Sequence, residues 1–364
     1  MQGERGADGG YAGGQRDELP WPGDAPLFAS GTDALAALLR WGVAERGWSR
    51  VWLPSYYCPD VPAALRAFPT GVDVLAYPDS DLGAPTKLSA VPAAAGDVVV
   101  VANQLGLRRP PMTGRLASAG AVLVEDHSHD LGSRWAFGSS ANYAFASLRK
   151  TLPIPDGGVV WSPGGLGLPP GPTLAGGGLT AGPLASAIEG RARRPDTGAE
   201  AGLRLRALAR AASAAAQAPA ASGASEGPGS PARRGISPVS RALVPQMPVR
   251  AWRERRRKNL ETLAAAMGTP RHATVLTAPE GGVAFALTLV FDTTQARVNA
   301  QRALTARAVV PSILWPLDPA RDQGTTEADA DLSRRIVSVH GDQRFTQADM
   351  LVLGGILREA LRGL

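Results

Sequence analysis

The sequence has 364 residues, enough for two domains. Hydrophobic residues make up 44% of it and charged residues 19%, a globular composition that excludes a mostly disordered chain. The single cysteine excludes an internal disulfide bond and a cysteine-based zinc site. The net charge is +6, but the arginines are mostly scattered along the sequence, so we expect no nucleic-acid partner.

Residues 1–20 are rich in glycine and polar side chains, which predicts a flexible N-terminal arm. They lack the apolar core of a signal peptide. No apolar run in the chain reaches the roughly 18 residues of a membrane-spanning helix. We therefore expect a cytoplasmic protein with no membrane partner.

The first half of the chain alternates between helical and strand patterns. Residues 30–33 supply N-cap side chains for a helix that continues over 34–47, and a second helical pattern covers 61–68. Short, continuous apolar runs predict buried strands at 51–55, 72–77, 97–103, 121–126, 141–148 and 157–161. Such strands, separated by helical stretches, indicate a parallel sheet that is buried on both faces.

The composition changes after about residue 163. Residues 184–216 have a helical composition, and 216–235 have the composition of a flexible, low-complexity insert. From about residue 246 a second unit follows, with helices at 249–268, 295–308 and 345–361 and strands at 283–292 and 334–340; Thr346 is the N-cap of the last helix, with Asp349 near position N3.

These patterns predict an α/β protein in three parts. The arm at 1–20 precedes a large domain at 21–245, whose mainly parallel sheet is flanked by helices. A smaller α+β C-terminal domain follows at 246–364.

Polar residues follow several of the predicted strands, at the sheet edge where α/β proteins bind ligands. They are Ser55–Cys58, Asn103–Gln104, Glu125–Asp130 and Ser147–Lys150. A metal site would need three converging ligands, and we expect none here. The helix start at Ser30, Gly31 and Thr32 offers free backbone N–H groups, which suit an anion.

Lysine is rare in this sequence. Of 38 basic side chains only Lys87, Lys150 and Lys258 are lysines. Any one of them can be an accidental survivor of an arginine-rich composition. A retained lysine also suits chemistry that needs an amine, because a guanidinium is never deprotonated in proteins.

Pyridoxal phosphate is one cofactor that these residues suit. It needs an amine for a Schiff base, a carboxylate at its pyridine nitrogen, donors for its phosphate, and a flat group against its ring. The sequence offers Lys150 as the amine, Asp126 as the carboxylate, Gly31, Thr32 and Ser147 for the phosphate, and Tyr56 or Tyr57 as the flat group.

The motifs, in this order, resemble those of the DegT/DnrJ/EryC1/StrS family, sugar aminotransferases of fold type I. The resemblance rests on SGTDAL at 30–35, LPSYYCPDV at 53–61, EDHSHDLG at 125–132 and SLRKTLPIPDGGVV at 147–160. Weaker similarity extends to 236–244, 253–267, 310–317 and 339–350. The stretch 163–235 shows none, and Phe145 stands where the family commonly has a serine.

The resemblance implies roles for individual residues. Lys150 would bind the cofactor covalently and shuttle a proton, Asp126 would pair with the pyridine nitrogen, and His129 would contact the oxygen on the cofactor ring. The phosphate ligands would be Ser30, Gly31, Thr32 and Ser147, and Tyr56 or Tyr57 would cover the ring, although the usual stacking position also aligns with Cys58.

The resemblance also implies an activity. We expect an aminotransferase of the fold type I class that moves an amino group from an amino acid donor, glutamate by default, to a keto group of a sugar, nucleotide-sugar or related metabolite. The family leads us to expect a homodimer. The unrecognisable middle region leaves an alternative open, a non-catalytic relative that acts as a binding or scaffold protein in a biosynthetic cluster.

Overall fold

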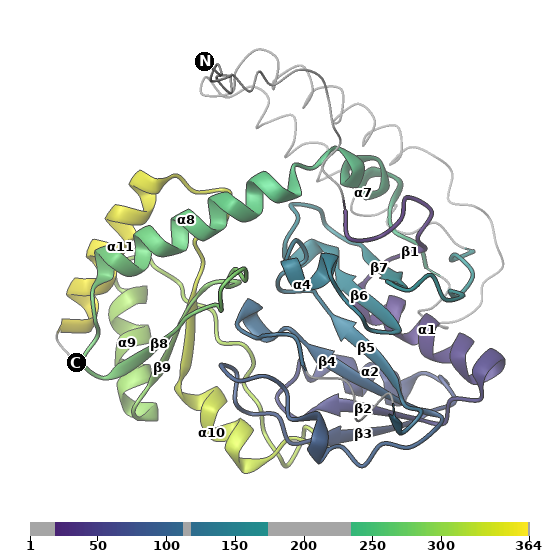
Figure 1. Ribbon diagram of the computed structural model, residues 1–364. Coiled ribbons are helices and arrows are strands. Elements are labelled where there is room, and N and C mark those ends of the chain that lie inside the picture. Colours follow the sequence, from purple (N-terminus) through teal and green to yellow (C-terminus); the bar gives the residue numbers. More distant parts are fainter. Residues whose placement is uncertain (1–18, 112–117, 174–233, 363–364) are drawn as a thin grey trace, which may run out of the picture.

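The structure is a computed structural model that describes residues 19–111, 118–173 and 234–362. Its larger part is a seven-stranded sheet in the order β1-β7-β6-β5-β4-β2-β3 (Figure 1). The strands are β1 (Leu27–Phe28), β2 (Arg50–Pro54), β3 (Asp73–Tyr77), β4 (Asp97–Ala102), β5 (Val122–Asp126), β6 (Tyr143–Ser147) and β7 (Gly158–Trp161). Strands β3, β2, β4, β5 and β6 form a parallel set, to which β7 and β1 add antiparallel pairs.

Strand β7 departs from the predicted parallel arrangement. It pairs antiparallel with β6, with Ser147 opposite Gly158 and Ala144 opposite Trp161. The connection over 148–157 is too short for a parallel crossover, which needs about a dozen residues or more. The mainly parallel sheet is confirmed, with an antiparallel edge.

Both faces of this sheet are buried, and β4 shows how. All its residues are buried. Val98 and Val100 pack into the core beneath helix α1 (Gly31–Arg46), whereas Val99 and Val101 pack into the core on the opposite face. The helices and 3₁₀ turns of this part are α1 (Gly31–Arg46), α2 (Asp60–Ala67), η1 (Leu88–Ala90), η2 (Gln104–Gly106), α4 (Arg134–Phe137), η3 (Leu148–Lys150), α7 (Pro238–Leu243) and η5 (Val244–Gln246).

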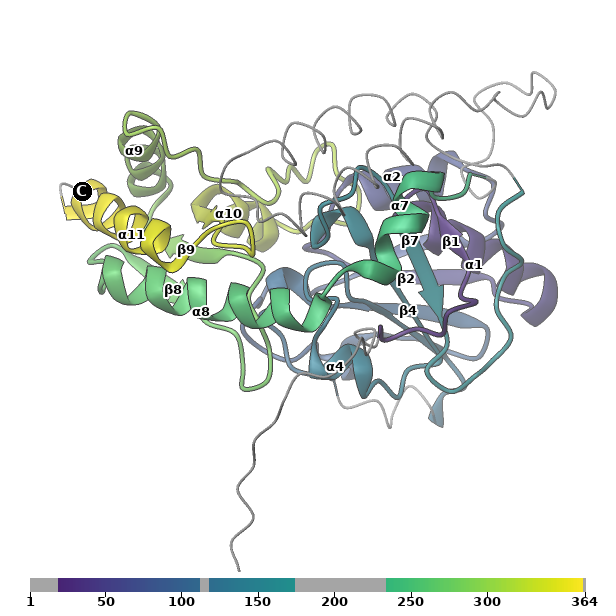
Figure 2. The same cartoon turned by 90° about the horizontal axis from the view of Figure 1, so that it is seen from above.

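The second part is a three-stranded antiparallel sheet with helices. Its strands, in the order β10-β9-β8, are β8 (Ala273–Leu276), β9 (Leu287–Phe291) and β10 (Ile336–Val339). Its helices are α8 (Val249–Met267), α9 (Thr294–Thr305), α10 (Glu327–Arg335) and α11 (Gln347–Arg362). Helix α11 packs along α8, and Figure 2 shows α8 leading from the large sheet into this smaller part.

The structure confirms most predicted elements to within a few residues. Thr346 and Asp349 cap α11 as predicted, since the Thr346 hydroxyl accepts from the Asp349 N–H at 3.2 Å and the Asp349 carboxylate accepts from the Thr346 N–H at 2.8 Å. The short strands β1 and β8 and the helices α4, α7 and α10 are not among the predicted elements. None of the described helices has the length and apolarity needed to cross a bilayer.

Some predictions fall on residues that the structure does not describe. The N-terminal arm, the helical stretch at 184–216 and the insert at 216–235 lie outside the described residues, apart from 19–20 and 234–235. Gly235 forms a bridge with Phe28 of β1. The domain boundaries at 20/21 and 245/246 stay predictions.

Candidate active site

The carboxyl edge of the parallel strands brings the predicted site residues together. Asp126 ends β5 and pairs in register with Phe145 of β6, so that Ser147 and the η3 turn with Lys150 follow on the neighbouring strand. Tyr57 follows β2 on the other side of β4. Their proximity comes from the parallel register, because all these strands end at one edge of the sheet.

Lys150 and His129 form the centre of this group. The Lys150 Nζ lies 3.3 Å from His129 Nε2. The other ring nitrogen, Nδ1, accepts a hydrogen bond from the Leu105 backbone N–H at 3.1 Å. Burial, with the positive charge of Lys150 next in importance, holds the pKa of His129 well below its usual 6.5. The ring is therefore neutral near pH 7, and we infer that its hydrogen is on Nε2, facing Lys150.

The donor to His129 sits on a strained segment of backbone. Leu105 has a φ of 54°, in the left-handed region that non-glycine residues rarely adopt. Its N–H bonds His129, and its carbonyl accepts from the N–H of Phe285 in the smaller part at 2.7 Å. This conformation costs energy that the two hydrogen bonds offset, as is common at functional sites.

Asp126 is a buried carboxylate with a donor on each oxygen. Its Oδ1 accepts from the Ser128 N–H at 2.8 Å, and its Oδ2 accepts from the Tyr57 hydroxyl at 2.5 Å. The side chain has no ion pair with another described residue. A carboxylate fixed in this way can still accept from a ring N–H, because each oxygen offers two lone-pair positions.

The start of α1 lies directly against the end of β6. Ser30 caps the helix by accepting from the Asp33 N–H at 3.1 Å. A Cβ added to Gly31 would lie 2.9 Å from Ser147 Cβ, and one added to Gly158 would overlap the Ser30 carbonyl. The hydroxyls of Thr32 and Ser147 bond no other described residue, so these groups and the helix N-terminus form a cradle for an anion.

The two tyrosines of the turn after β2 point in different directions. The Tyr56 hydroxyl donates to the Leu314 carbonyl, and its ring centroid lies 6.1 Å from that of Trp315. Tyr57 instead reaches Asp126. Cys58 is half-buried and lies near Lys150 and Asp126. Burial raises the pKa of its thiol most, whereas the charge of Lys150 lowers this pKa and the charge of Asp126 raises it. The stacking role of Tyr56 or Tyr57 stays a prediction.

Two aromatic side chains from the smaller part complete the surroundings of Lys150. The Trp315 ring stacks on His129 with centroids 5.8 Å apart, and Lys150 Nζ lies 5.7 Å from the Trp315 centroid. Phe285 contacts His129 at a centroid distance of 4.7 Å. We did not predict either of them as a site residue, because no local signal links residues so far along the chain to Lys150.

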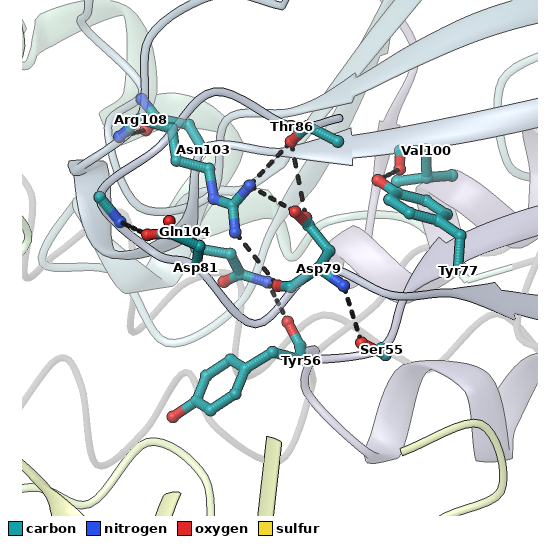
Figure 3. A network of polar contacts seen from close by, with 11 residues as sticks. Ser55, Tyr56, Tyr77, Asp79, Asp81, Thr86, Val100, Asn103, Gln104 and Arg108 are labelled. Atoms are coloured by element: carbon teal, nitrogen blue, oxygen red, sulfur yellow. Dashed lines mark hydrogen bonds and ion pairs between the residues drawn. The ribbon is translucent and has the colours of Figure 1, made fainter. Parts of the chain in front are cut away.

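Other candidate polar residues have structural partners. The His127 Nε2 lies 3.0 Å from a carboxylate oxygen of Glu125. Among the described residues, no set of histidine, cysteine or acidic side chains is arranged to hold a metal. Figure 3 shows the network after β3 and β4, in which the buried Arg108 binds Asp79 at 2.7 Å and Thr86 at 2.8 Å. Gln104 donates to the Tyr56 carbonyl there.

These groups fit pyridoxal phosphate. The amine of Lys150, the carboxylate of Asp126 and the glycine-lined cradle, whose two hydroxyls have no partner among the described residues, are of the kinds that the cofactor needs for its covalent bond, its ring nitrogen and its phosphate. His129 would offer its Nε2–H beside Lys150. All of them lie along one edge of one sheet.

The comparisons with known proteins concern the whole fold. The sequence matches no protein-family model and no curated protein. Many solved structures are similar to it.

Three of the similar structures serve as examples. A DegT/DnrJ/EryC1/StrS aminotransferase from Brucella abortus matches 93% of this chain and 86% of its own, with 16% identity and a TM-score of 0.57. DesI, solved with its TDP-sugar product, matches 93% and 81%, with 19% identity and a TM-score of 0.58. Helicobacter pylori PseC, an aminotransferase of pseudoaminic acid biosynthesis, matches 93% and 86%, with 11% identity and a TM-score of 0.60. The chain therefore has the fold type I architecture of the DegT/DnrJ/EryC1/StrS aminotransferases.

Proposed function

We propose that the protein is a pyridoxal phosphate-dependent aminotransferase. It takes an amino group from an amino acid donor, glutamate by default, and transfers it to a keto group of a sugar, nucleotide-sugar or related metabolite. The observation that carries the proposal is the convergence of Lys150, Asp126 and the Gly31–Ser147 contact at one sheet edge. The names of the similar structures support the sugar as acceptor.

The bound cofactor would supply an electron sink for the substrate carbon. The chain supplies the remaining functions. Lys150 Nζ holds and moves the proton, His129 Nε2–H donates to the oxygen on the cofactor ring, and Asp126 binds the ring nitrogen. Ser30, Gly31, Thr32 and Ser147 hold the phosphate.

The walls of the site come from both parts of the molecule. Trp315 and Phe285 cover His129 on the side of the smaller part, and Leu105 ties that part to the large sheet. Lys150 is half-buried, and its amine lies 5.7 Å from the centroid of the Trp315 ring. We also propose a homodimer, which light scattering of the purified protein would test.

Replacing Lys150 tests the proposal. Wild-type protein incubated with pyridoxal phosphate should develop a yellow absorbance band, and borohydride reduction should fix the cofactor on the peptide that contains Lys150. Lys150→Ala and Lys150→Arg should lose both signals, because neither side chain offers a neutral amine. Lys258→Ala is the matched control, since Lys258 lies exposed on α8 beside Glu254.

The outcomes separate the candidate functions. Loss of the yellow absorbance band on addition of glutamate, with release of 2-oxoglutarate, supports the aminotransferase. A band that no amino donor changes indicates the non-catalytic relative. Wild-type protein that binds no pyridoxal phosphate would overturn the proposal.

A further inference from the structure

The hydroxyl of Tyr57 is the only side-chain donor to Asp126 among the described residues. The two side chains are buried, with exposed fractions of 5% and 7%. The donor–acceptor distance of 2.5 Å is at the short end of the range for hydrogen bonds between a hydroxyl and an oxygen acceptor. Tyr57 therefore holds one of the two oxygens of the carboxylate predicted to face the cofactor.

The phenol is a permanent donor. Burial raises the pKa of Tyr57 well above 10, and the charge of Asp126 and the hydrogen bond to it raise it further. The hydroxyl therefore keeps its proton near pH 7 and does not act as an acid or base there. What remains is a fixed dipole that points at Asp126.

The ring of Tyr57 is held in place independently of its hydroxyl. It packs in the core beneath α1 with Leu53 and Leu65, and it lines a cavity of about 240 Å³ between the ends of β2 and β3 and the loop at 321–325. Replacing tyrosine by phenylalanine would keep this packing and remove only the donor to Asp126.

We propose that Tyr57 is a positioning residue for the cofactor, which acts through Asp126 by fixing the orientation of its carboxylate and supplying one of its two donors. This inference rests on the proposed function. It gives Tyr57 a role different from ring stacking, because the side chain lies against the carboxylate at the ring-nitrogen end.

The effect should appear when the cofactor is bound. In the empty site, water can replace the lost hydroxyl and satisfy Asp126. In the loaded site the bound cofactor would exclude that water, so Oδ2 would be left without the donor that Tyr57 supplies. The loss therefore weakens cofactor binding more than it weakens the fold.

The test compares Tyr57→Phe with Tyr77→Phe. Tyr77 is a matched control, since it is 1% exposed and its hydroxyl donates to the Val100 carbonyl at 2.8 Å rather than to Asp126 (Figure 3). We expect Tyr57→Phe to raise the dissociation constant for pyridoxal phosphate about tenfold or more. It should also shift the position and the pH dependence of the yellow band. Tyr77→Phe should change neither, even where the two variants melt at similarly lowered temperatures.

A second comparison tests whether Tyr57 acts through Asp126. In an Asp126→Asn background, Tyr57→Phe should have a much smaller effect on the dissociation constant than in the wild-type background. Equal effects in both backgrounds, or a Tyr57→Phe protein that binds the cofactor with wild-type affinity and spectrum, would overturn the inference. Failure of the wild-type protein to bind pyridoxal phosphate would instead overturn the proposed function.

Discussion

Gly31 occupies the closest contact between the start of α1 and the strand that leads to Lys150. An alanine Cβ there would lie 2.9–3.1 Å from the Cβ, N and Cα of Ser147. Two of these atoms belong to the backbone, which a rotamer change cannot move. The absence of a side chain at Gly31 thus sets the width of the proposed phosphate cradle.

Gly31→Ala should therefore lower both stability and cofactor affinity. Alanine normally favours a helix over glycine by up to ~1 kcal/mol, so a net loss would report the collision with Ser147. We expect ~1–3 kcal/mol of destabilisation in urea unfolding and weaker binding of pyridoxal phosphate. Gly164→Ala is the control, because a Cβ there meets nothing within 4 Å. Equal behaviour of the two variants would contradict the close-contact argument.

Site residues could be predicted where neighbouring residues in the sequence place them, and not where contacts with distant parts of the chain do. Lys150, Asp126 and His129 could be located because each follows a recognisable buried strand. The different directions of Tyr56 and Tyr57 could not, since they depend on contacts with Leu314 and with Asp126. Trp315 and Phe285 reach the site only through tertiary packing, which local patterns do not encode.

At the scale of elements, the starts of β2 and β4 are joined by a buried carboxylate. Asp97 accepts hydrogen bonds from Arg50 Nε at 2.7 Å, Trp52 Nε1 at 3.0 Å and the Ala94 N–H at 3.0 Å. Burial would raise the pKa of Asp97, but the three donors outweigh it and hold the pKa below its usual 3.8. The ionised form is therefore preferred in the folded state.

This shift gives a pH dependence of known sign. A carboxyl whose folded pKa is depressed stabilises the fold above the unfolded pKa, near 3.9, and loses that contribution as pH falls through its folded value. Asp97→Asn should lower the melting temperature at pH 7, and its difference from wild type should shrink below about pH 4. Asp73→Asn, at the exposed start of β3 on the other side of Arg50, should show little change. A pH-independent difference for Asp97→Asn would refute this account.

Element prediction succeeded where the apolar pattern was long. The six buried residues of β4 and the capped α11 are clear from the sequence. Strand β1 has two residues and β8 has four, most of them half-buried, so neither has a strong pattern. The antiparallel direction of β7 depends on the length of the preceding connection rather than on the strand's own residues.

At the scale of the molecule, the loop after β5 fastens the two parts together. Asp130 is 3% exposed, and its oxygens accept from Arg253 of α8 at 3.2 Å and from the Val283 N–H at 3.2 Å. Gln343 donates to the Thr151 carbonyl at 3.0 Å beside it. A change at Asp130 therefore acts on the relative placement of the two sheets.

Asp130→Ala should weaken this junction. It leaves the buried Val283 N–H without an acceptor, which costs ~1–3 kcal/mol, and removes the partner of Arg253. Urea unfolding followed by tryptophan fluorescence should show this loss. Asp130→Asn retains an acceptor oxygen and should recover part of it. An alanine variant as stable as wild type would show that the junction does not depend on Asp130.

The walls around Lys150 have a consequence for biosynthesis of the chain. Lys150, Asp126 and the anion cradle all lie in the first half of the sequence, whereas Phe285 and Trp315 emerge from the ribosome much later. A nascent or truncated chain that ends before residue 285 would hold the amine of Lys150 without its aromatic neighbours and without the hydrogen bond that the Phe285 N–H donates to the Leu105 carbonyl. The site is complete only when the chain has been translated beyond Trp315.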